Sequence, residues 1–303
     1  MSKFMSVSRM AVAVAVAGLA LSACGGDSGS GEASASPSGI PAVTADDALA
    51  AQVPDAVKST GQLVFGTDAS YAPSEFLADD GSTIVGFDVD LGKAIAAKLG
   101  LEGVFENSTF DSLIVGVQNG KFPASMSSFT INPEREKQVN MISYFNAGTS
   151  WAVQTGNPSG ISVEDPCGKT VAVQKATVQV DDIQAKNEDC KSDGKPEINI
   201  QQYSLQSEAT TAVVSGKADA MLADSPVVAY AIQQSGKLEQ LGDIYDSAPY
   251  GIVVPKEETE FATAIQGAVD ALIQDGTYQA ILDQWGVGNG AITQAEVNPS
   301  TGS

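Results

Sequence analysis

Between roughly residues 60 and 287, short apolar strands alternate with amphipathic helices, and this order restricts the chain to an α/β fold. The first clear strand covers residues 62–66. In the helix that follows it, Leu91, Ile95 and Leu99 recur every four residues and share one face. Strands separated by helices form a sheet covered by helices, and ligands bind just beyond the C-terminal ends of such strands.

The same alternation continues to the end of this region. The apolar pattern predicts further strands at 124–129, 151–153, 168–173, 197–201 and 250–255, one more that begins at 104, and helices that begin at 110 and cover 261–272 and 278–285. With 303 residues, the chain is long enough for two domains of ordinary size.

The strand at 124–129 leads into the segment Ser127-Ser128-Phe129-Thr130-Ile131-Asn132-Pro133-Glu134-Arg135. Asn132 suits a helix N-cap, and Pro133 suits the first helical position. Arg135 would then lie in the first turn, where the helix dipole disfavours a cation. An arginine at this position indicates a bound anion such as a carboxylate, held by free amides and the guanidinium. The alternative is an exposed arginine on a surface helix.

A second unit repeats this plan. The segment 117–121 followed by Ala124-Ser125-Met126 is similar to 214–217 followed by Ala218-Asp219-Ala220-Met221. The second copy ends in Ala223-Asp224-Ser225-Pro226. It therefore places an anionic side chain, Asp224, after its strand, where the first copy places the cationic Arg135. This pairing suits a zwitterion held between two lobes; the alternative role of the aspartate is to cap the helix that begins there.

Composition excludes several functional classes. The chain has no histidine, which removes serine–histidine triads and zinc sites that use histidine. Its 37 acidic residues outnumber 16 basic ones, giving a net charge of -21. This charge argues against nucleic acid as a partner. We therefore expect no nucleic-acid partner, no metal and no cofactor.

The N-terminus is a targeting segment rather than part of the fold. Basic residues precede an apolar stretch that is too short to span a membrane stably. Leu21-Ser22-Ala23-Cys24 resembles a bacterial lipobox, which implies that residues 1–23 are a lipoprotein signal peptide and that Cys24 carries lipid. The alternative is an ordinary secretory signal. Small polar residues follow, so we expect residues 24–58 to hold the lipidated cysteine and a flexible tether.

Two cysteines remain, Cys167 and Cys190. An even pair in an exported chain predicts a disulfide, the alternative being two free thiols. Closing a loop of this length stabilises the fold by roughly 3 kcal/mol in the chain-entropy model.

Five motifs in order carry a resemblance to a known family. They are Gly66-Thr67-Asp68 with Tyr71-Ala72-Pro73, Gly86-Phe87-Asp88-Val89-Asp90-Leu91, Phe129-Thr130-Ile131-Asn132-Pro133-Glu134-Arg135, Gly216-Lys217-Ala218-Asp219-Ala220, and Asp275-Gly276-Thr277-Tyr278 closing on Trp285-Gly286-Val287. Over roughly residues 60–287 the chain resembles the bacterial extracellular solute-binding proteins of the polar amino-acid ABC-importer type (family 3).

The resemblance implies a two-lobed, periplasmic-binding-protein-like fold of type II. Each lobe would be a mixed sheet flanked by helices, and two hinge strands would join the lobes. Lobe 1 would comprise 59–148 and 252–288, and lobe 2 with the hinge strands would comprise 149–251. We expect 289–303 to be a loose tail. A ligand between the lobes would stabilise the closed form, and the importer would recognise that form.

The resemblance also implies how a ligand's amino-acid group is held. Arg135 would pair with the α-carboxylate, with Ser128 and Thr130 as polar neighbours. Asp224 would accept from the α-ammonium, and Thr177 would reach the carboxylate from lobe 2.

Three further residues would surround the ligand's side chain. Tyr71 and Phe110 would flank it, and Asp68 would face it, accepting from either a basic or an amide group. The alternatives are core positions for the two aromatic residues and a turn or cap for Asp68. Ser74 replaces the phenylalanine common in the family, and Lys175 replaces a small residue; these changes bear on the substrate rather than the fold.

The function that follows is the non-catalytic capture of an amino acid for an ABC importer. The expected partners are the amino acid, a membrane permease and a lipid anchor at the extracytoplasmic face of the cell membrane, with the protein a monomer. The alternatives are an enzyme similar to the cyclohexadienyl dehydratases and a ligand sensor for a membrane receptor. An enzyme would need a placed general acid or base, and the sequence offers no isolated carboxylate beyond the clamp.

Overall fold

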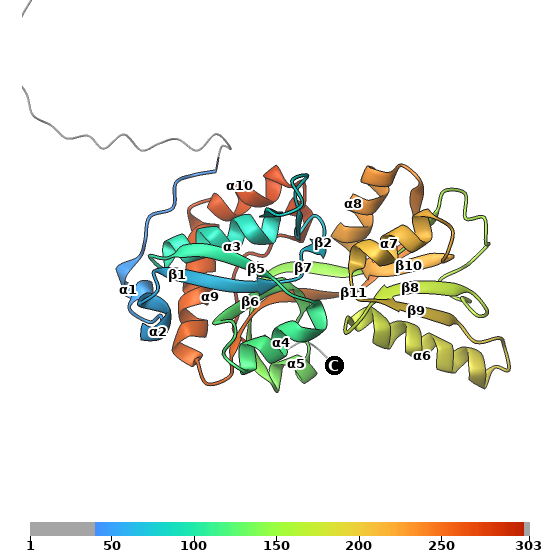
Figure 1. Ribbon diagram of the computed structural model, residues 1–303, viewed down its shortest axis with the longest axis horizontal. Coiled ribbons are helices and arrows are strands. Elements are labelled where there is room, and N and C mark those ends of the chain that lie inside the picture. The colour runs from blue at the N-terminus through green and yellow to red at the C-terminus, as the bar shows by residue number, and fades with distance from the viewer. Residues whose placement is uncertain (1–39, 300–303) are drawn as a thin grey trace, which may run out of the picture. The chain divides into compact units, whose positions relative to one another are not determined.

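The computed structural model describes residues 40–299 of the chain. Its main strands are β1 (Gln62–Thr67), β5 (Glu102–Asn107), β6 (Ala124–Thr130), β7 (Val139–Gln154), β8 (Thr170–Gln174), β9 (Asn199–Tyr203), β10 (Ala220–Asp224) and β11 (Leu238–Pro255). They form one mixed eight-stranded sheet in the order β5-β1-β6-β11-β7-β10-β8-β9 (Figure 1). The predicted α/β class is confirmed. The signal peptide and Cys24 lie outside the described residues.

Two long antiparallel strands, β7 and β11, run through both halves of the sheet (Figure 1). Their pairing joins Ile142 to Ile252 in one half and Trp151 to Leu241 in the other. Between these points the register shifts three times, on either side of Tyr245 and again between Tyr250 and Gly251. We call the half with β1, β5 and β6 lobe 1 and the half with β8, β9 and β10 lobe 2. The shared strands are where the sequence places the lobe crossings.

Helices cover both faces of each lobe. Lobe 1 carries α1 (Asp47–Ala50), α2 (Asp55–Lys58), α3 (Phe87–Lys98), α4 (Phe110–Gln118), α5 (Pro133–Glu136), α9 (Thr259–Gln274) and α10 (Thr277–Gln284), and lobe 2 carries α6 (Val178–Ser192), α7 (Gln206–Val214) and α8 (Ser225–Ser235). In Figure 1, α7 and α8 lie over one face of lobe 2 and α6 over the other. The predicted apolar face of α3, formed by Leu91, Ile95 and Leu99, is at most 1% exposed.

Smaller elements complete lobe 1. The strands β2 (Ser70–Tyr71), β3 (Glu75–Leu77) and β4 (Ile84–Val85) form a three-stranded sheet, and η1 (Gly288–Gly290) follows α10. None of these short strands has an apolar pattern long enough to be recognised from sequence. Among the described helices, none is long and apolar enough to cross a membrane.

The part of the predicted tether that the structure describes belongs to the fold. Ile40, Val43 and Leu49 pack against the core of lobe 1, and Val53 and Val57 are buried within it. The expectation of a flexible tether as far as residue 58 is therefore wrong at this end. Apolar side chains spaced along this polar segment supply enough burial to hold it in place.

The predicted loose tail is also docked in its described part. Ala295 is fully buried, and Val297 forms an isolated antiparallel bridge with Ile142. The side chain of Asn298 accepts a hydrogen bond from the backbone of Met141 at 2.9 Å. Residues 289–299 therefore extend the packing of lobe 1, because a few buried contacts compensate for the ordering of a polar segment.

The predicted disulfide between Cys167 and Cys190 is present, with the two Cα atoms 5.6 Å apart. It joins the last turns of α6 to the segment that precedes β8. Cys190 is 2% exposed and lies in an apolar cluster of lobe 2. The bridge therefore ties α6 to the segment before β8 within lobe 2.

Candidate functional site

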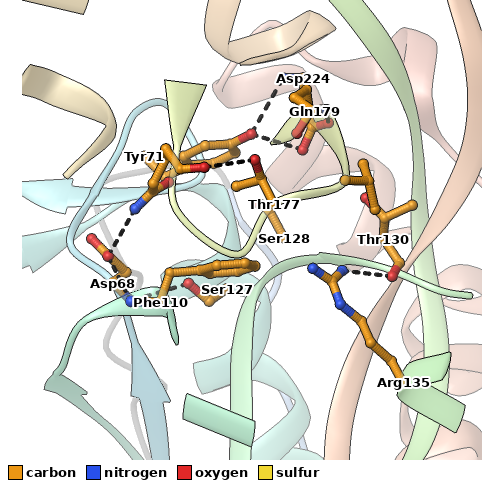
Figure 2. Close-up of a pocket in the computed structure, with 12 residues that line it drawn as sticks. Asp68, Tyr71, Phe110, Ser127, Ser128, Thr130, Arg135, Thr177, Gln179 and Asp224 are labelled. Carbon is orange, nitrogen blue, oxygen red and sulfur yellow. Dashed lines mark hydrogen bonds between the residues drawn. The ribbon is translucent and has the colours of Figure 1, made fainter. Parts of the chain in front are cut away.

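A cavity lies between the lobes, where β1 and β6 of lobe 1 and β8 and β10 of lobe 2 reach their C-terminal ends (Figure 2). Its lining residues are Asp68, Tyr71, Phe110, Ser127, Ser128, Thr130, Arg135, Gln174, Thr177, Val178, Gln179 and Asp224. All eight residues that the sequence predicts as ligand contacts are among them. The structure thus brings these residues together, as expected for an open α/β sheet.

The helix start that the sequence predicts around Arg135 is present but short. Asn132 is the N-cap, and its side chain accepts from the backbone N–H of Arg135 at 2.9 Å. Because α5 has only four residues, its dipole is too small to supply an anion site by itself. Arg135 is 8% exposed, so it is not a surface arginine, and any bound anion must depend on the guanidinium.

The guanidinium of Arg135 is held from both lobes. Nη1 donates to the carbonyl of Thr130 at 2.7 Å (Figure 2). Nη2 donates to the carbonyl of Ala176 in lobe 2 at 3.1 Å. The guanidinium also lies 5.4 and 5.7 Å from the ring centroids of Phe110 and Phe129, at cation–π distance. Burial lowers the pKa of Arg135 to about 10, so it is charged at neutral pH.

Asp224 brings a buried carboxylate to the cavity from the end of β10. Oδ2 accepts from the hydroxyl of Tyr71 at 2.9 Å, and Oδ1 accepts from Nε2 of Gln179 at 2.8 Å (Figure 2). Oδ2 also accepts from the hydroxyl of Tyr250 at 2.8 Å. Burial raises the pKa of Asp224. Within the described residues its side chain makes no capping hydrogen bond to α8, so it faces the cavity rather than the helix.

Asp68 is the third buried charge, and it follows the end of β1. Oδ1 accepts from the hydroxyl of Ser70 at 2.6 Å, and Oδ2 accepts from the backbone of Phe110 at 2.9 Å and from Nε2 of Gln174 at 3.0 Å. Asp68 is 1% exposed, and burial raises its pKa. The capping alternative is partly right, because Asp68 holds the first amide of α4 while it lines the cavity.

Two further predicted residues, Thr177 and Ser128, line the cavity from the two lobes. Thr177 is the N-cap of the 15-residue helix α6, and its hydroxyl donates to the carbonyl of Gln174 at 2.8 Å. Ser128 has a φ of 51°, a value that only a few per cent of non-glycine residues adopt. Its Oγ is buried without a hydrogen-bond partner among residues 40–299. Such backbone strain often occurs at ligand sites.

Four lining residues were not predicted: Ser127, Gln174, Val178 and Gln179. Gln174 ends β8, so the same strand-end rule that identified Asp68 and Asp224 could have found it. Gln179 lies in the first turn of α6. Its role depends on Asp224, 45 residues away, and no local pattern contains that contact.

The substituted position Ser74 lies away from this cavity. Ser74 is fully buried, and its Oγ has no hydrogen-bond partner in the part of the chain that the structure describes. It is not one of the residues that line the cavity between the lobes. The expectation that Ser74 bears on the substrate is therefore wrong for this cavity, and its unpaired buried hydroxyl bears on the stability of the fold instead.

A pair of fully buried carboxyl groups, Glu75 and Asp88, lies directly behind the site. Ser127 donates to Glu75 Oε1 at 2.9 Å, and Asp88 Oδ2 accepts from Tyr144 at 2.7 Å and from the backbone of Ser128 at 3.2 Å. Burial and then repulsion by Asp88 raise the pKa of Glu75 well above its usual value. Glu75 Oε2 and Asp88 Oδ1 have no hydrogen-bond partner among residues 40–299, and burial raises the pKa of both carboxyl groups.

Comparison with known proteins agrees with this arrangement. The family of bacterial extracellular solute-binding proteins, family 3, matches residues 63–288. The arginine-binding protein ArgT of Corynebacterium glutamicum is 38% identical over 252 residues, which cover 82% of each chain. The ABC transporter glutamine-binding protein GlnH of Bacillus subtilis is 31% identical over 271 residues, which cover 88% of this chain and 91% of that one.

A solved structure shows the same fold. The structure of an ancestral arginine-binding protein bound to arginine matches with a TM-score of 0.68 and 35% identity, covering 74% of this chain and 98% of that one. With a family match over residues 63–288 and relatives of this similarity, the chain belongs to the bacterial extracellular solute-binding proteins of family 3.

Proposed function

We propose that this protein is the substrate-binding subunit of an amino-acid ABC importer and that arginine is the first ligand to test. One observation carries the proposal: Arg135 and Asp224, a buried cation and a buried anion, line one cavity from opposite lobes. Buried charges are stable only when they are paired. The α-carboxylate and α-ammonium of a free amino acid supply both partners at once.

The donors and acceptors of the two groups fit these roles. A guanidinium has five N–H donors and no acceptor, and the carbonyls of Thr130 and Ala176 take up two of these donors. Further donors remain for a carboxylate, and the hydroxyl of Ser128, which also lines the cavity, has no hydrogen-bond partner among residues 40–299. Asp224 is held by neutral donors only, so its negative charge stays available to an ammonium group.

Contacts across the cavity support ligand capture by hinge closure. Tyr71 of lobe 1 donates to Asp224 of lobe 2, and Ser70 of lobe 1 accepts from the backbone of Gln206 of lobe 2 at 3.0 Å. The ring of Phe76 also lies 5.7 Å from that of Tyr230 on α8. A ligand that binds both lobes would add to these contacts. A permease would then recognise the surface of the closed form.

The same geometry favours binding over catalysis. A dehydratase needs a general acid or base aimed at the reacting atoms. Both carboxylates that line the cavity, Asp68 and Asp224, already accept three hydrogen bonds each from the protein. Such groups are suited to fixing a ligand's position. Anchoring through lipid on Cys24 remains a prediction, and it concerns residues outside the described part.

Isothermal titration calorimetry with three ligands tests this clamp. Arginine carries both charged groups, agmatine lacks the carboxylate, and 5-guanidinopentanoate lacks the ammonium. Because a hydrogen bond to a charged group contributes about 1.5–3 kcal/mol, we expect each truncated ligand to bind about 10- to 100-fold more weakly than arginine. Agmatine binding as tightly as arginine would contradict the role of Arg135, and equal binding of 5-guanidinopentanoate would contradict that of Asp224.

A further inference from the structure

One side chain of the cavity has its orientation fixed by its surroundings. Gln174, at the end of β8, is 1% exposed. Its Nε2 donates to Asp68 Oδ2 at 3.0 Å and to the carbonyl of Ser204 at 3.2 Å. Its own backbone carbonyl accepts from the hydroxyl of Thr177 at 2.8 Å. The residue is therefore held both at its backbone and at its amide nitrogen.

Exchanging the positions of Oε1 and Nε2 in the side-chain amide of Gln174 would break two hydrogen bonds. Its two partners, a carboxylate oxygen and a carbonyl oxygen, are acceptors with no hydrogen to give. A reversed amide would place Oε1 against both of them, with two repulsive contacts in place of two hydrogen bonds. The network therefore assigns the nitrogen to Asp68 and Ser204 and leaves the oxygen for another partner.

That oxygen is unpaired. Gln174 lines the cavity, and its Oε1 is buried without a hydrogen-bond partner among residues 40–299. A buried polar atom left without a partner costs about 1–3 kcal/mol, and the great majority of such atoms in native proteins are paired. A donor on a ligand in this cavity would satisfy it.

Asp68 beside it also offers only acceptor capacity. Its carboxylate has about four lone-pair sites, and three are used by Ser70, Phe110 and Gln174. The nearby hydroxyl protons are engaged as well, because Ser70 donates to Asp68 and Ser127 donates to Glu75. Asp68 and Gln174 therefore present oxygen acceptors here, and the hydroxyls of Ser70 and Ser127 beside them already donate within the protein.

We propose that Gln174 is a specificity-determining residue whose Oε1, together with Asp68, selects a ligand side chain that ends in N–H donors only, favouring a guanidinium over a carboxamide. This inference rests on the proposed function and names the side chain that the site takes. A guanidinium has donors and no acceptor. A carboxamide or ureido group carries one oxygen, which would meet the oxygens of Gln174 and Asp68.

Arginine and citrulline make the sharpest pair of probes, because they have nearly the same shape and citrulline replaces one terminal nitrogen with a carbonyl oxygen. The measurement is the ratio of their Kd values by isothermal titration calorimetry for the refolded wild type and two variants. Gln174→Met removes the acceptor at similar volume. Gln179→Met is the matched control, because Gln179 binds Asp224 at the amino-acid end and its loss should weaken both ligands by the same factor.

We expect the wild type to prefer arginine by at least about 100-fold, because sites built for one hydrogen-bonding pattern reject the wrong one strongly. Gln174→Met should reduce this preference at least about tenfold, the equivalent of one lost hydrogen bond, while Gln179→Met should leave it unchanged. If Gln174 had only a structural role, Gln174→Met would weaken the binding of arginine and citrulline equally. That result would overturn the inference.

The wild type alone gives a second test if Gln174→Met does not fold. Titration with glutamine should give a far higher Kd than titration with arginine. Glutamine or citrulline binding as tightly as arginine would overturn the inference while leaving the proposed amino-acid capture intact. Absence of binding by every amino acid would instead remove the proposed function and the inference together.

Discussion

Replacing Arg135 with alanine should abolish ligand binding and also weaken the fold. From the sequence, Arg135 is expected on a largely exposed helix start, where its loss would leave the fold intact. The structure shows the side chain at 8% exposure with hydrogen bonds to two carbonyls. Arg135→Ala leaves the carbonyls of Thr130 and Ala176 without these donors and removes a cation from beside two aromatic rings.

The size of both effects follows from these contacts. An intramolecular hydrogen bond contributes about 0.5–1.5 kcal/mol net, so two lost bonds predict a fall in unfolding free energy of about 1–3 kcal/mol without ligand. Binding should suffer more, because the ligand's carboxylate would be buried without its partner, which costs about 3–5 kcal/mol. That loss corresponds to an increase in Kd of about 100- to 4,000-fold.

The two effects need separate assays. Urea unfolding without ligand measures the stability change, and isothermal titration calorimetry with arginine measures the affinity. Arg135→Lys is the matched variant: it keeps the charge and loses the planar fork, so it should bind with intermediate affinity. Affinity of Arg135→Ala within about threefold of the wild type would refute the carboxylate anchor. Unchanged stability would show that its two carbonyl contacts contribute nothing.

Three further predictions concern stability and can be measured by urea unfolding. Replacing Cys167 and Cys190 with serine should lower the unfolding free energy by about 3 kcal/mol, because it opens a closed loop; an unchanged value would mean that the bridge does not form. Ser74→Ala should raise stability by about 1 kcal/mol, because it removes a buried hydroxyl without a partner, and a fall would show that this hydroxyl is satisfied. Glu75 faces Asp88, Tyr144 and Asp68, and burial raises its pKa above 4.5. The contribution of Glu75 to the free energy of unfolding is therefore complete below pH 4.5 and is lost as the pH rises through the raised pKa. Wild-type stability should therefore decline with rising pH relative to Glu75→Gln, and parallel curves would refute the raised pKa of Glu75.

Local patterns were sufficient to predict much of this fold. The four-residue spacing of Leu91, Ile95 and Leu99 marks a buried helix face, and the face is buried. Asn132 and Pro133 mark a helix start because capping depends on residues adjacent in the chain. The strand-end rule placed Asp68 and Asp224 at one cavity because it follows from the topology of parallel strands.

Features that depend on distant contacts were missed. The docking of 40–58 and 289–299 depends on lobe 1 surfaces formed by other segments, and neither segment has a periodic pattern. The role of Gln174 depends on Asp68, which lies 106 residues earlier in the chain. The burial of Arg135 likewise depends on Ala176 in the other lobe. Sequence periodicity describes the local environment of a residue and contains no information about such partners.

The most direct test of the central claim is a calorimetric titration of the refolded protein with arginine, after unfolding in guanidinium to remove any carried ligand. Capture between the lobes predicts saturable binding of one arginine per chain. It also predicts that arginine at 100 times its Kd raises the unfolding free energy by about 2.7 kcal/mol. Absence of heat and of stabilisation with arginine and with each of the other amino acids would contradict the assignment of this cavity as an amino-acid site.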